Sequence, residues 1–416
     1  MSRRRRRRIG WEWGLPFLQY GPEWRKQRRI IWQQFHPGVI PKYHPALIEG
    51  ARRLVLRLLD DPDRLPEHIL YAIGGTIVEA TYGLTVAAED DKYITIANRS
   101  VQDVHRLVSI SAMVFQALPA LARVPTWLPL PGVGILRALE EARMWAKKMR
   151  NESWEDAKAA TEKGSAKPST VSLMIENMTH LSPEDAAREE ESCKSVGAVI
   201  YSAGIDTTYS IISAFFMAMA LHPEVQQKAR AELDAVVGGA RLPTFSDREN
   251  LPYVNAILRE VGRWHVVAPM GFPRATTEDD EYKGYFIAKG TAVIVNAWAI
   301  LHNRELYPDP DAFKPERFLK DGKIDPDIMD PSSVSFGLGR RGCPGRHLAE
   351  ASAFIYMAFV LQNLVISRPL GEDGEPIPFE PSVRGDIIIA FKDLRCVIKP
   401  RSESTLTLIR QDDSSM

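Results

Sequence analysis

The ten residues from Phe336 to Gly345 read FGLGRRGCPG and constrain this 416-residue chain more than any other stretch. They surround a single cysteine, Cys343, with four glycines and a proline, and they place Arg340 and Arg341 beside it. Glycine lets a backbone approach a flat cofactor closely. Loop N–H groups can hydrogen-bond to a thiolate, and arginine can pair with cofactor carboxylates. The stretch therefore predicts a thiolate ligand, with a glycine-rich surface turn around a buried free cysteine as the alternative.

The spacing F-x-x-G-x-R-x-C-x-G resembles the haem-binding signature of the cytochrome P450 family. It matches that signature at Phe336, Gly339, Arg341, Cys343 and Gly345. The resemblance implies a haem b cofactor whose iron takes its axial thiolate from Cys343. Phe336, Gly339, Arg341 and Gly345 are then expected to contact the cofactor.

A second motif, AGIDTT from Ala203 to Thr208, lies inside a long apolar helical stretch. Glycine and threonine are poor helix formers, and a buried aspartate is costly without a partner. The motif resembles the family's central helix, which implies that Asp206 and Thr207 are catalytic and handle protons, and that Gly204 leaves room for oxygen. The alternative is an ordinary kinked helix whose threonines bond back to their own carbonyls.

Two further motifs predict a structural network. Glu260 and Arg263 share a helix face as E-x-x-R, and Arg317 follows in Pro315–Phe318, which reads PERF. In this order, upstream of the cysteine loop, they resemble the family's Glu–Arg–Arg network. The role that the resemblance implies is structural, and we assign these residues no catalytic role. The alternative is a solvated surface pair, which a lone E-x-x-R usually is.

Four residues are expected to hold the haem propionates. Trp24 and Arg28, four apart in W-R-K-Q-R, resemble the family's W-x-x-x-R, and Arg274 and Arg341 would be the other partners. For Trp24 and Arg28 the alternative is a surface helix with one buried indole. The sequence indicates the substrate pocket only weakly. The resemblance places mostly apolar residues there, which suits a lipophilic substrate. They are Ile200, Ala203, Val266, Val267, Ala268, Pro269 and Met270.

Composition narrows the class of protein. Lys+Arg and Asp+Glu are both 53, which gives no sign of nucleic-acid binding, and 45% of residues are hydrophobic, enough for a large core. The three cysteines, Cys193, Cys343 and Cys396, are far apart and odd in number, which argues against a disulfide framework and for a reducing compartment.

Hydrophobic periodicity predicts a chain that is helical as far as residue 265 and partly β thereafter. The fold class is therefore mainly α with a smaller β region (α+β), and the resemblance makes it a cytochrome P450 fold. The expected helices are 23–35, 46–59, 67–81, 94–118, 136–161, 183–221, 223–237 and 347–364. Tyr282–Val295 should form β-hairpins with turns at Gly284 and Gly290, and short strands are expected near 386–390 and 395–398.

The sequence leads to different predictions for the two ends of the chain. Six arginines, Arg3–Arg8, make either a polybasic contact at a membrane surface or, as we favour, a solvated tail or a product of a misplaced start codon. The expected division is a basic N-terminal remnant at 1–20, a haem domain at 21–400 and a disordered tail at 401–416. The resemblance implies a domain that lacks the family's membrane anchor, N-terminal helices and first sheet strands.

The leading functional hypothesis is a monooxygenase that inserts one atom of O2 into a lipophilic small molecule. The resemblance implies electrons from an NADPH-dependent flavoprotein reductase and the cytoplasmic side of the endoplasmic reticulum, and details resemble fungal microsomal members. Without a transmembrane anchor, the cytoplasm is the alternative location. Two other functions remain open: a truncated remnant without catalysis, and a haem-thiolate isomerase or dehydratase.

Overall fold

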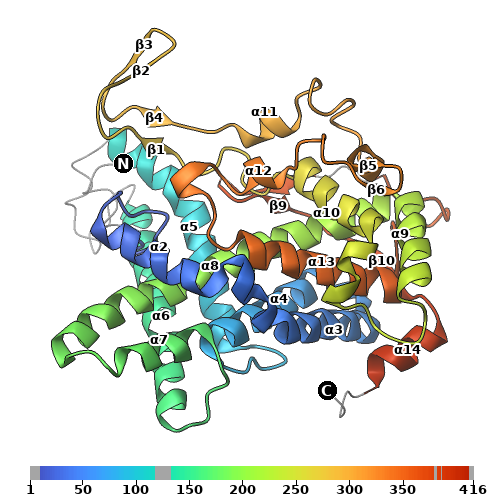
Figure 1. The fold of residues 1–416 in the computed structure, drawn as a ribbon, viewed down its shortest axis with the longest axis horizontal. Helices are drawn as coiled ribbons and strands as arrows, with labels where there is room; N and C mark the ends of the chain where they lie inside the picture. Colours follow the sequence, from blue (N-terminus) through green and yellow to red (C-terminus); the bar gives the residue numbers. More distant parts are fainter. Residues whose placement is uncertain (1–9, 118–132, 379–381, 386, 412–416) are drawn as a thin grey trace. The chain divides into compact units, whose positions relative to one another are not determined.

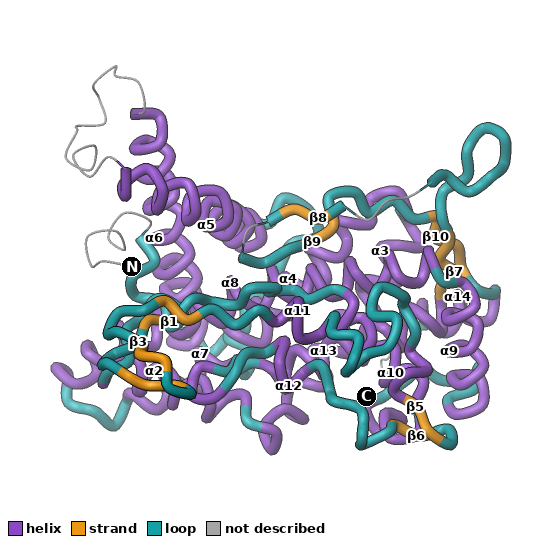
Figure 2. Tube along the Cα trace, turned by 90° about the horizontal axis from the view of Figure 1, so that it is seen from above, coloured by secondary structure: helices purple, strands orange, loops and turns teal. Residues whose placement is uncertain are grey.

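The chain folds into two units in the computed structural model, which describes residues 10–117, 133–378, 382–385 and 387–411. The first unit comprises residues 1–57, 66–209 and 344–352, and the second comprises residues 58–65, 210–343 and 353–416. Figure 1 follows the elements along the sequence, and Figure 2 shows that helix far outweighs strand. The mainly α fold class is thereby confirmed. The arginine run at Arg3–Arg8 lies outside the described residues.

The first unit is built from helices. They are α2 (Pro22–Phe35), most of α3 (His44–Asp60), α4 (Leu65–Tyr82), α5 (Lys92–Ala117), α6 (Val133–Glu162), α7 (Thr170–Met178) and the first part of α8 (Pro183–Leu221), with a 3-10 segment η1 (Pro37–Tyr43). Apart from α7 and η1, all of these helices were predicted within a few residues. The short α7 is capped by Ser169, whose hydroxyl accepts the Ser172 N–H in a capping box.

The long helix α8 begins where its sequence predicts. The Ser182 hydroxyl accepts the Asp185 N–H at 3.2 Å, and Pro183 follows at the first helical position, where its missing N–H costs nothing. Further along, Gly197 lets α8 approach α4, because a Cβ there would lie 3.3 Å from the Tyr82 hydroxyl. This close contact holds the AGIDTT segment against the core of the first unit.

The second unit contains the rest of the helices and the strands. Its helical elements are η2 (Pro62–Arg64), the end of α8, α9 (Pro223–Val236), η4 (Phe245–Asn250), α10 (Pro252–Trp264), α11 (Ala297–Leu301), η5 (Pro315–Phe318), α12 (Ser332–Ser335), η6 (Gly339–Arg341), most of α13 (Arg346–Asn363) and α14 (Glu403–Arg410). Around α10, a buried cluster joins Val266, Leu301, Tyr307 and Phe318. This cluster fixes the coil that follows α11.

The described strands form short antiparallel pairs. These are β1 (Arg274–Ala275) with β4 (Ala292–Val293), β2 (Asp280–Tyr282) with β3 (Tyr285–Ile287), β5 (Leu319–Lys320) with β6 (Lys323–Ile324), β7 (Leu364–Ser367) with β10 (Val397–Pro400), and β8 (Val383–Arg384) with β9 (Ala390–Phe391). The β2–β3 hairpin turns at Lys283 and Gly284, which both have positive φ. The turns expected at Gly284 and Gly290 are confirmed, whereas residue 386 of the expected strand lies outside the described residues.

The expectation of disorder from about Arg401 onward is wrong for residues 403–410, which form α14. Ser402 caps this helix, and the side chains of its residues Thr405 and Ile409 are buried. The Arg401 guanidinium also pairs with Asp234, with an N–O distance of 2.9 Å. The segment is short and polar, so its two buried side chains gave too weak a pattern to predict; residues 412–416 lie outside the description.

Within the described part of the chain, one helix, α8, has the length and composition of a membrane span. Of its most apolar window, 67% is buried inside the fold. A buried core helix passes the same test of length and hydropathy, so α8 is weak support for a membrane span.

Candidate functional site

The cysteine loop of the second unit is closed by three backbone hydrogen bonds. The Cys343 N–H donates to the Phe336 carbonyl at 2.6 Å, Gly342 donates to Gly339 at 3.0 Å, and Gly337 donates to Val334 at 2.9 Å. Because these bonds tie both ends of the loop together, the position of the Cys343 side chain is set by the backbone.

Glycine is required in this loop for two different reasons. Gly337 and Gly339 have φ values of +78° and +56°, in the left-handed region that favours glycine. Gly342 is needed for space, since a Cβ there would lie 3.3 Å from the Gly339 oxygen and 3.4 Å from the Gly337 oxygen. The spacing of the glycines is therefore a condition for presenting the thiol.

The three cysteines, all of them within the described residues, lie in different surroundings. Cys193 is buried and Cys396 is half-buried, and desolvation raises the pKa of both thiols to about 12. Cys343 is exposed, which excludes the alternative of a buried free cysteine. An accessible sulfur on a rigid glycine loop has the donor chemistry that haem iron takes from a protein.

Buried charges join α10 to the coil that follows it. Glu260 and Arg263 are both 0% exposed and pair through two bonds of 2.7 and 2.8 Å. The Arg317 Nε donates to Glu260 Oε1 at 3.1 Å, and the Lys314 backbone N–H donates to the same oxygen at 2.8 Å. The structure therefore brings the three residues of the expected network together.

The arginines of this network also hold the backbone. Arg263 donates to the carbonyls of Leu301 and Pro310, and Arg317 donates to those of Pro308 and Ala312. The Arg263 guanidinium lies 5.5 Å from the centre of the Tyr307 ring. Because these donors reach carbonyls of an irregular segment, they replace the hydrogen bonds that regular secondary structure would supply.

The expected pocket segment follows α10 directly. Val266 is buried, Val267, Ala268 and Pro269 are half-buried, and Met270 is 45% exposed. Its backbone is fixed at two carbonyls: Ile389 donates to Val267 at 2.9 Å, and Trp298 donates to Pro269 at 3.1 Å. The segment therefore presents a defined apolar surface.

Sequence reasoning missed the residue that begins this segment, His265. Its side chain is 4% exposed, and its Nε2 lies 2.9 Å from Ser210 Oγ. Burial lowers the pKa of His265 to about 4, opposed by a hydrogen bond to the Ile389 carbonyl. The sequence shows that His265 lies two residues after Arg263. It does not show its hydrogen-bond partners, because Ser210 and Ile389 are far from His265 along the chain.

In the first unit, the AGIDTT segment is more accessible than the rest of α8. Asp206 and Thr207 are half-buried and Ala203 is exposed, whereas Tyr201 is fully buried and Thr208 nearly so. The Thr207 hydroxyl donates to the Ala203 carbonyl at 2.6 Å, the back-bonding that a kinked helix would show. Its oxygen can still accept a hydrogen bond.

Gly204 and Ile200, two further residues of α8 named in the sequence analysis, differ in their surroundings. A Cβ on Gly204 would lie 3.1 to 3.3 Å from the Ile77 side chain, so in the structure this glycine makes room for α4. Ile200, one turn before Gly204, is half-buried. Ile200 and Ala203 therefore belong to the partly accessible side of α8.

The expected propionate partners divide between the units. In the first, Trp24 is buried on α2 with its ring centre 5.0 Å from that of Tyr20, and Arg28 is half-buried one turn later. In the second, Arg274 lies on β1 and Arg341 on η6, both half-buried. Burial lowers the pKa of Arg274, so its charge is held in a partly desolvated place.

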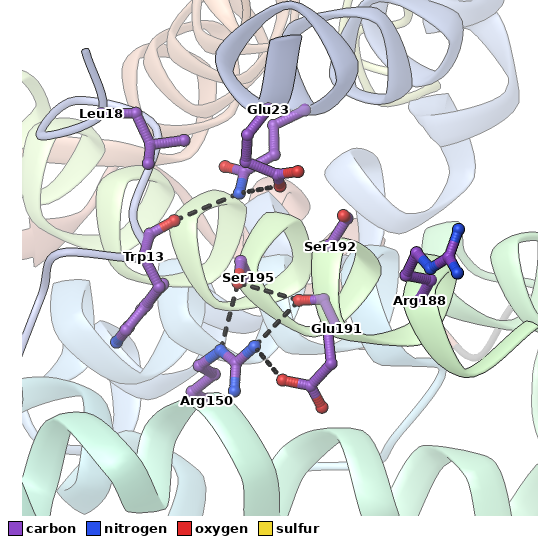
Figure 3. A pocket seen from close by; sticks show the side chains of 9 residues that line it. Trp13, Leu18, Glu23, Arg150, Arg188, Glu191, Ser192 and Ser195 are labelled. Atoms are coloured by element: carbon purple, nitrogen blue, oxygen red, sulfur yellow. Dashed lines mark hydrogen bonds and ion pairs between the residues drawn. The ribbon is translucent and has the colours of Figure 1, made fainter. Parts of the chain in front are cut away.

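A cavity of about 250 Å³ lies in the first unit and contains none of the predicted site residues. Figure 3 shows Arg150 at the edge of this cavity, with its guanidinium bonded to Ser195 and Glu191. The Arg150 carbon Cζ lies 5.8 Å from the centre of the Trp13 ring. These mutual bonds make the cavity a polar junction between α6 and α8.

Comparison with known proteins gives consistent similarities. The family described as cytochrome P450 matches residues 5–387. The chain is 38% identical to cytochrome P450 monooxygenase COX2 of Coprinopsis cinerea over 98% of this chain and 77% of that protein. It is 35% identical to tryptamine 4-monooxygenase of Psilocybe cyanescens over 96% of this chain and 78% of that protein.

A solved structure gives the same fold. A zebrafish cytochrome P450 determined with abiraterone aligns with a TM-score of 0.73, over 96% of this chain and 87% of that one. The two sequences are 23% identical, so this likeness concerns the fold alone.

Proposed function

This chain belongs to the cytochrome P450 family of haem-thiolate monooxygenases, and from that premise we propose that Cys343 is the axial ligand of its haem iron. The observation that carries the assignment is the exposed thiol on a closed loop, whereas Cys193 is buried and Cys396 is half-buried. When bound, the haem supplies oxygen activation, so that one atom of O2 enters the substrate and the other leaves as water. Loop N–H groups that hydrogen-bond to the coordinated sulfur would lower its basicity.

We assign proton handling to Asp206 and Thr207. A half-buried carboxylate can relay protons between solvent and the interior, which a fully buried ion pair cannot do. The Thr207 hydroxyl, whose own proton is held by the Ala203 carbonyl, can accept a hydrogen bond and so keep a water or an oxygen atom in place. Together they hold a proton beside the helix and control when it is delivered.

Four basic or N–H-bearing side chains, Trp24, Arg28, Arg274 and Arg341, are proposed to hold the haem carboxylates. An arginine binds a carboxylate through a charge-assisted hydrogen bond, and an indole N–H adds a neutral one. Partial burial strengthens each pair by removing competing water. Phe336, Gly339 and Gly345 would contact the haem through ring and backbone.

The proposed substrate is a lipophilic small molecule. Its pocket takes Ile200 and Ala203 from α8 and Val266 to Met270 from the segment after α10. Most of these side chains are half-buried or exposed, so they have apolar surface to offer a ligand.

As a member of the family, the chain takes electrons from a redox partner. We propose an NADPH-dependent flavoprotein reductase, because Arg340 and Arg346 are exposed near the cysteine in sequence and suit an acidic partner. We propose the cytoplasmic face of the endoplasmic reticulum as the location where such a partner is met.

The test is haem binding by three cysteine variants. Cys343→Ala should lose the red-shifted absorption band of the reduced carbonyl complex, because that band requires a thiolate ligand. Cys396→Ala and Cys193→Ala are matched controls and should keep it. If Cys343→Ala retained the band, or if one of the controls lost it while folded, the assignment would be wrong.

A further inference from the structure

We propose that His265, together with Ser210, is a positioning residue that fixes the substrate-facing wall from Val266 to Met270. The imidazole and the hydroxyl hold the carbonyl of Ile389, and the N–H of Ile389 holds the wall. The inference rests on the proposed function, because the wall is a substrate surface only in a haem enzyme of this family.

We call His265, Ser210 and the Ile389 carbonyl the node. His265 and Ser210 are buried in the second unit, and Ile389 is half-buried. His265 Nε2 lies 2.9 Å from Ser210 Oγ and 3.3 Å from the Ile389 carbonyl oxygen. Ser210 Oγ donates its one proton to the same carbonyl. Since that proton is used, the Ser210 oxygen is an acceptor towards His265, and we assign the hydrogen to Nε2 from the network. The single Nε2–H is then shared between Ser210 Oγ and the Ile389 carbonyl, and that carbonyl accepts from both the Ser210 hydroxyl and the imidazole.

The imidazole is fixed by packing as well as by hydrogen bonds. Its ring stacks on Phe391 with the centres 4.9 Å apart and an interplanar angle of 28°. Its backbone N–H is the last bond of α10, donated to the Val261 carbonyl at 2.9 Å. The position of the His265 ring is thus set by α10 and β9. Through its hydrogen bond, the ring in turn restrains the Ile389 carbonyl.

Ile389 connects the node to the wall through a single residue. Its carbonyl faces His265 and Ser210, and its N–H donates to the Val267 carbonyl at 2.9 Å. If the carbonyl loses its donors, the backbone of residue 389 gains freedom, and the bond to Val267 weakens. The other end of the wall is held independently, because Trp298 donates to Pro269 at 3.1 Å.

This separation gives an internal control for amide hydrogen exchange. His265→Phe keeps a ring against Phe391 but removes the donor, and Ser210→Ala removes the hydroxyl. Both should speed exchange at the Ile389 amide about tenfold, the effect of losing one buried hydrogen bond, while the Trp298 amide keeps its wild-type rate. His265→Gln, whose amide nitrogen reaches the Nε2 position, should restore protection.

The matched control variant is Ser213→Ala, on the same helix α8. Ser213 is 1% exposed, and its hydroxyl has no hydrogen-bond partner among the described residues. Removing it deletes the same atom at a similar depth without touching the node. It should leave exchange at both amides unchanged.

A binding measurement tests whether the wall contacts ligands. Imidazole and its 1-butyl to 1-decyl derivatives bind haem iron through nitrogen, and their tails report the shape of the pocket. His265→Phe and Ser210→Ala should alter the affinity ratio of the decyl to the butyl compound by about tenfold, with imidazole itself unaffected.

Two results would overturn the proposal: wild-type exchange at Ile389 in both node variants, or the same change in Ser213→Ala as in Ser210→Ala. If His265→Phe does not fold, Ser210→Ala carries the test. Failure to bind imidazole would count against the haem assignment instead, since hydrogen exchange decides the node whether or not haem is bound.

Discussion

Two charged motifs of this chain, the Glu260–Arg263 pair and the Asp206–Thr207 pair, look equally out of place in their helices but have opposite surroundings. Glu260 and Arg263 are completely buried, and their charges meet each other, Arg317 and several carbonyls. Asp206 and Thr207 are half-buried, and the Thr207 hydroxyl bonds within its own helix turn. A buried charge whose partners are all protein groups serves the architecture, whereas a half-exposed polar pair is available for chemistry.

The largest expected loss of stability comes from a substitution in the buried Glu260–Arg263 pair. Glu260→Gln leaves Arg263 and Arg317 without a counter-charge, and losing one partner of such a pair costs about 3–5 kcal/mol. Urea unfolding should show this loss, together with a poor yield of folded protein. Lys314→Gln is the matched control, because that side chain is 52% exposed and pairs with the exposed Asp309, while its backbone N–H still reaches Glu260. Equal stability of the two variants would contradict the network.

The next effect concerns His265 and depends on pH. Its pKa is lowered to about 4 by burial, whereas the unfolded chain has an ordinary histidine with a pKa near ~6.5. Between these values the unfolded state binds a proton that the folded state does not, so stability falls as the pH drops from ~6.5 to ~4, by up to about 3 kcal/mol. His265→Phe should lack this contribution, and its unfolding free energy should be flatter across that range. Parallel curves for the two proteins would argue that the imidazole titrates freely.

A smaller effect tests the backbone of the cysteine loop. Gly339→Ala has open space for its methyl group, so its cost is only the left-handed conformation, about 1–2 kcal/mol. Gly239→Ala also meets no atom within 4 Å and lacks the positive φ, which makes it the matched control. Thermal unfolding should separate the two variants, and an unstrained Gly339→Ala would show that the loop does not depend on this glycine.

The smallest effect on stability belongs to the half-buried motif. Thr207→Ala removes one bond inside a helix turn, so the free energy of unfolding should change by no more than about 1 kcal/mol. Electron use should nevertheless change, with reducing equivalents diverted to hydrogen peroxide, measured as peroxide formed per NADPH consumed. If the amount of peroxide formed per NADPH were unchanged, Thr207 would have no role in proton handling. The Asp206–Thr207 motif would then differ from the Glu260–Arg263 pair in burial but not in function.

The sequence predicted those parts of the fold whose signals are local. The start of α8 at Pro183, the E-x-x-R spacing and the glycine pattern around Cys343 each depend on residues close together in the sequence, and α8 begins where it was expected. The α14 helix was missed because only Thr405 and Ile409 are buried in it, and α7 was missed because a nine-residue helix shows little periodicity.

The candidate site was predictable only where it resembles a family motif. The node of Ser210, His265 and Ile389 joins residues 55 and 179 positions apart, and no local pattern marks such a contact. The same limit applies to Gly204, whose position in AGIDTT suggested space for oxygen, whereas its neighbour in the structure is Ile77. Long-range packing decides such details, and the sequence does not display it.

The most direct test of the central assignment is X-ray absorption at the iron edge of the purified protein. The account predicts a sulfur atom in the first coordination shell of iron, and its replacement by nitrogen or oxygen in Cys343→Ser. A first shell without sulfur in the wild-type protein, or a sulfur signal that survives in Cys343→Ser, would contradict it.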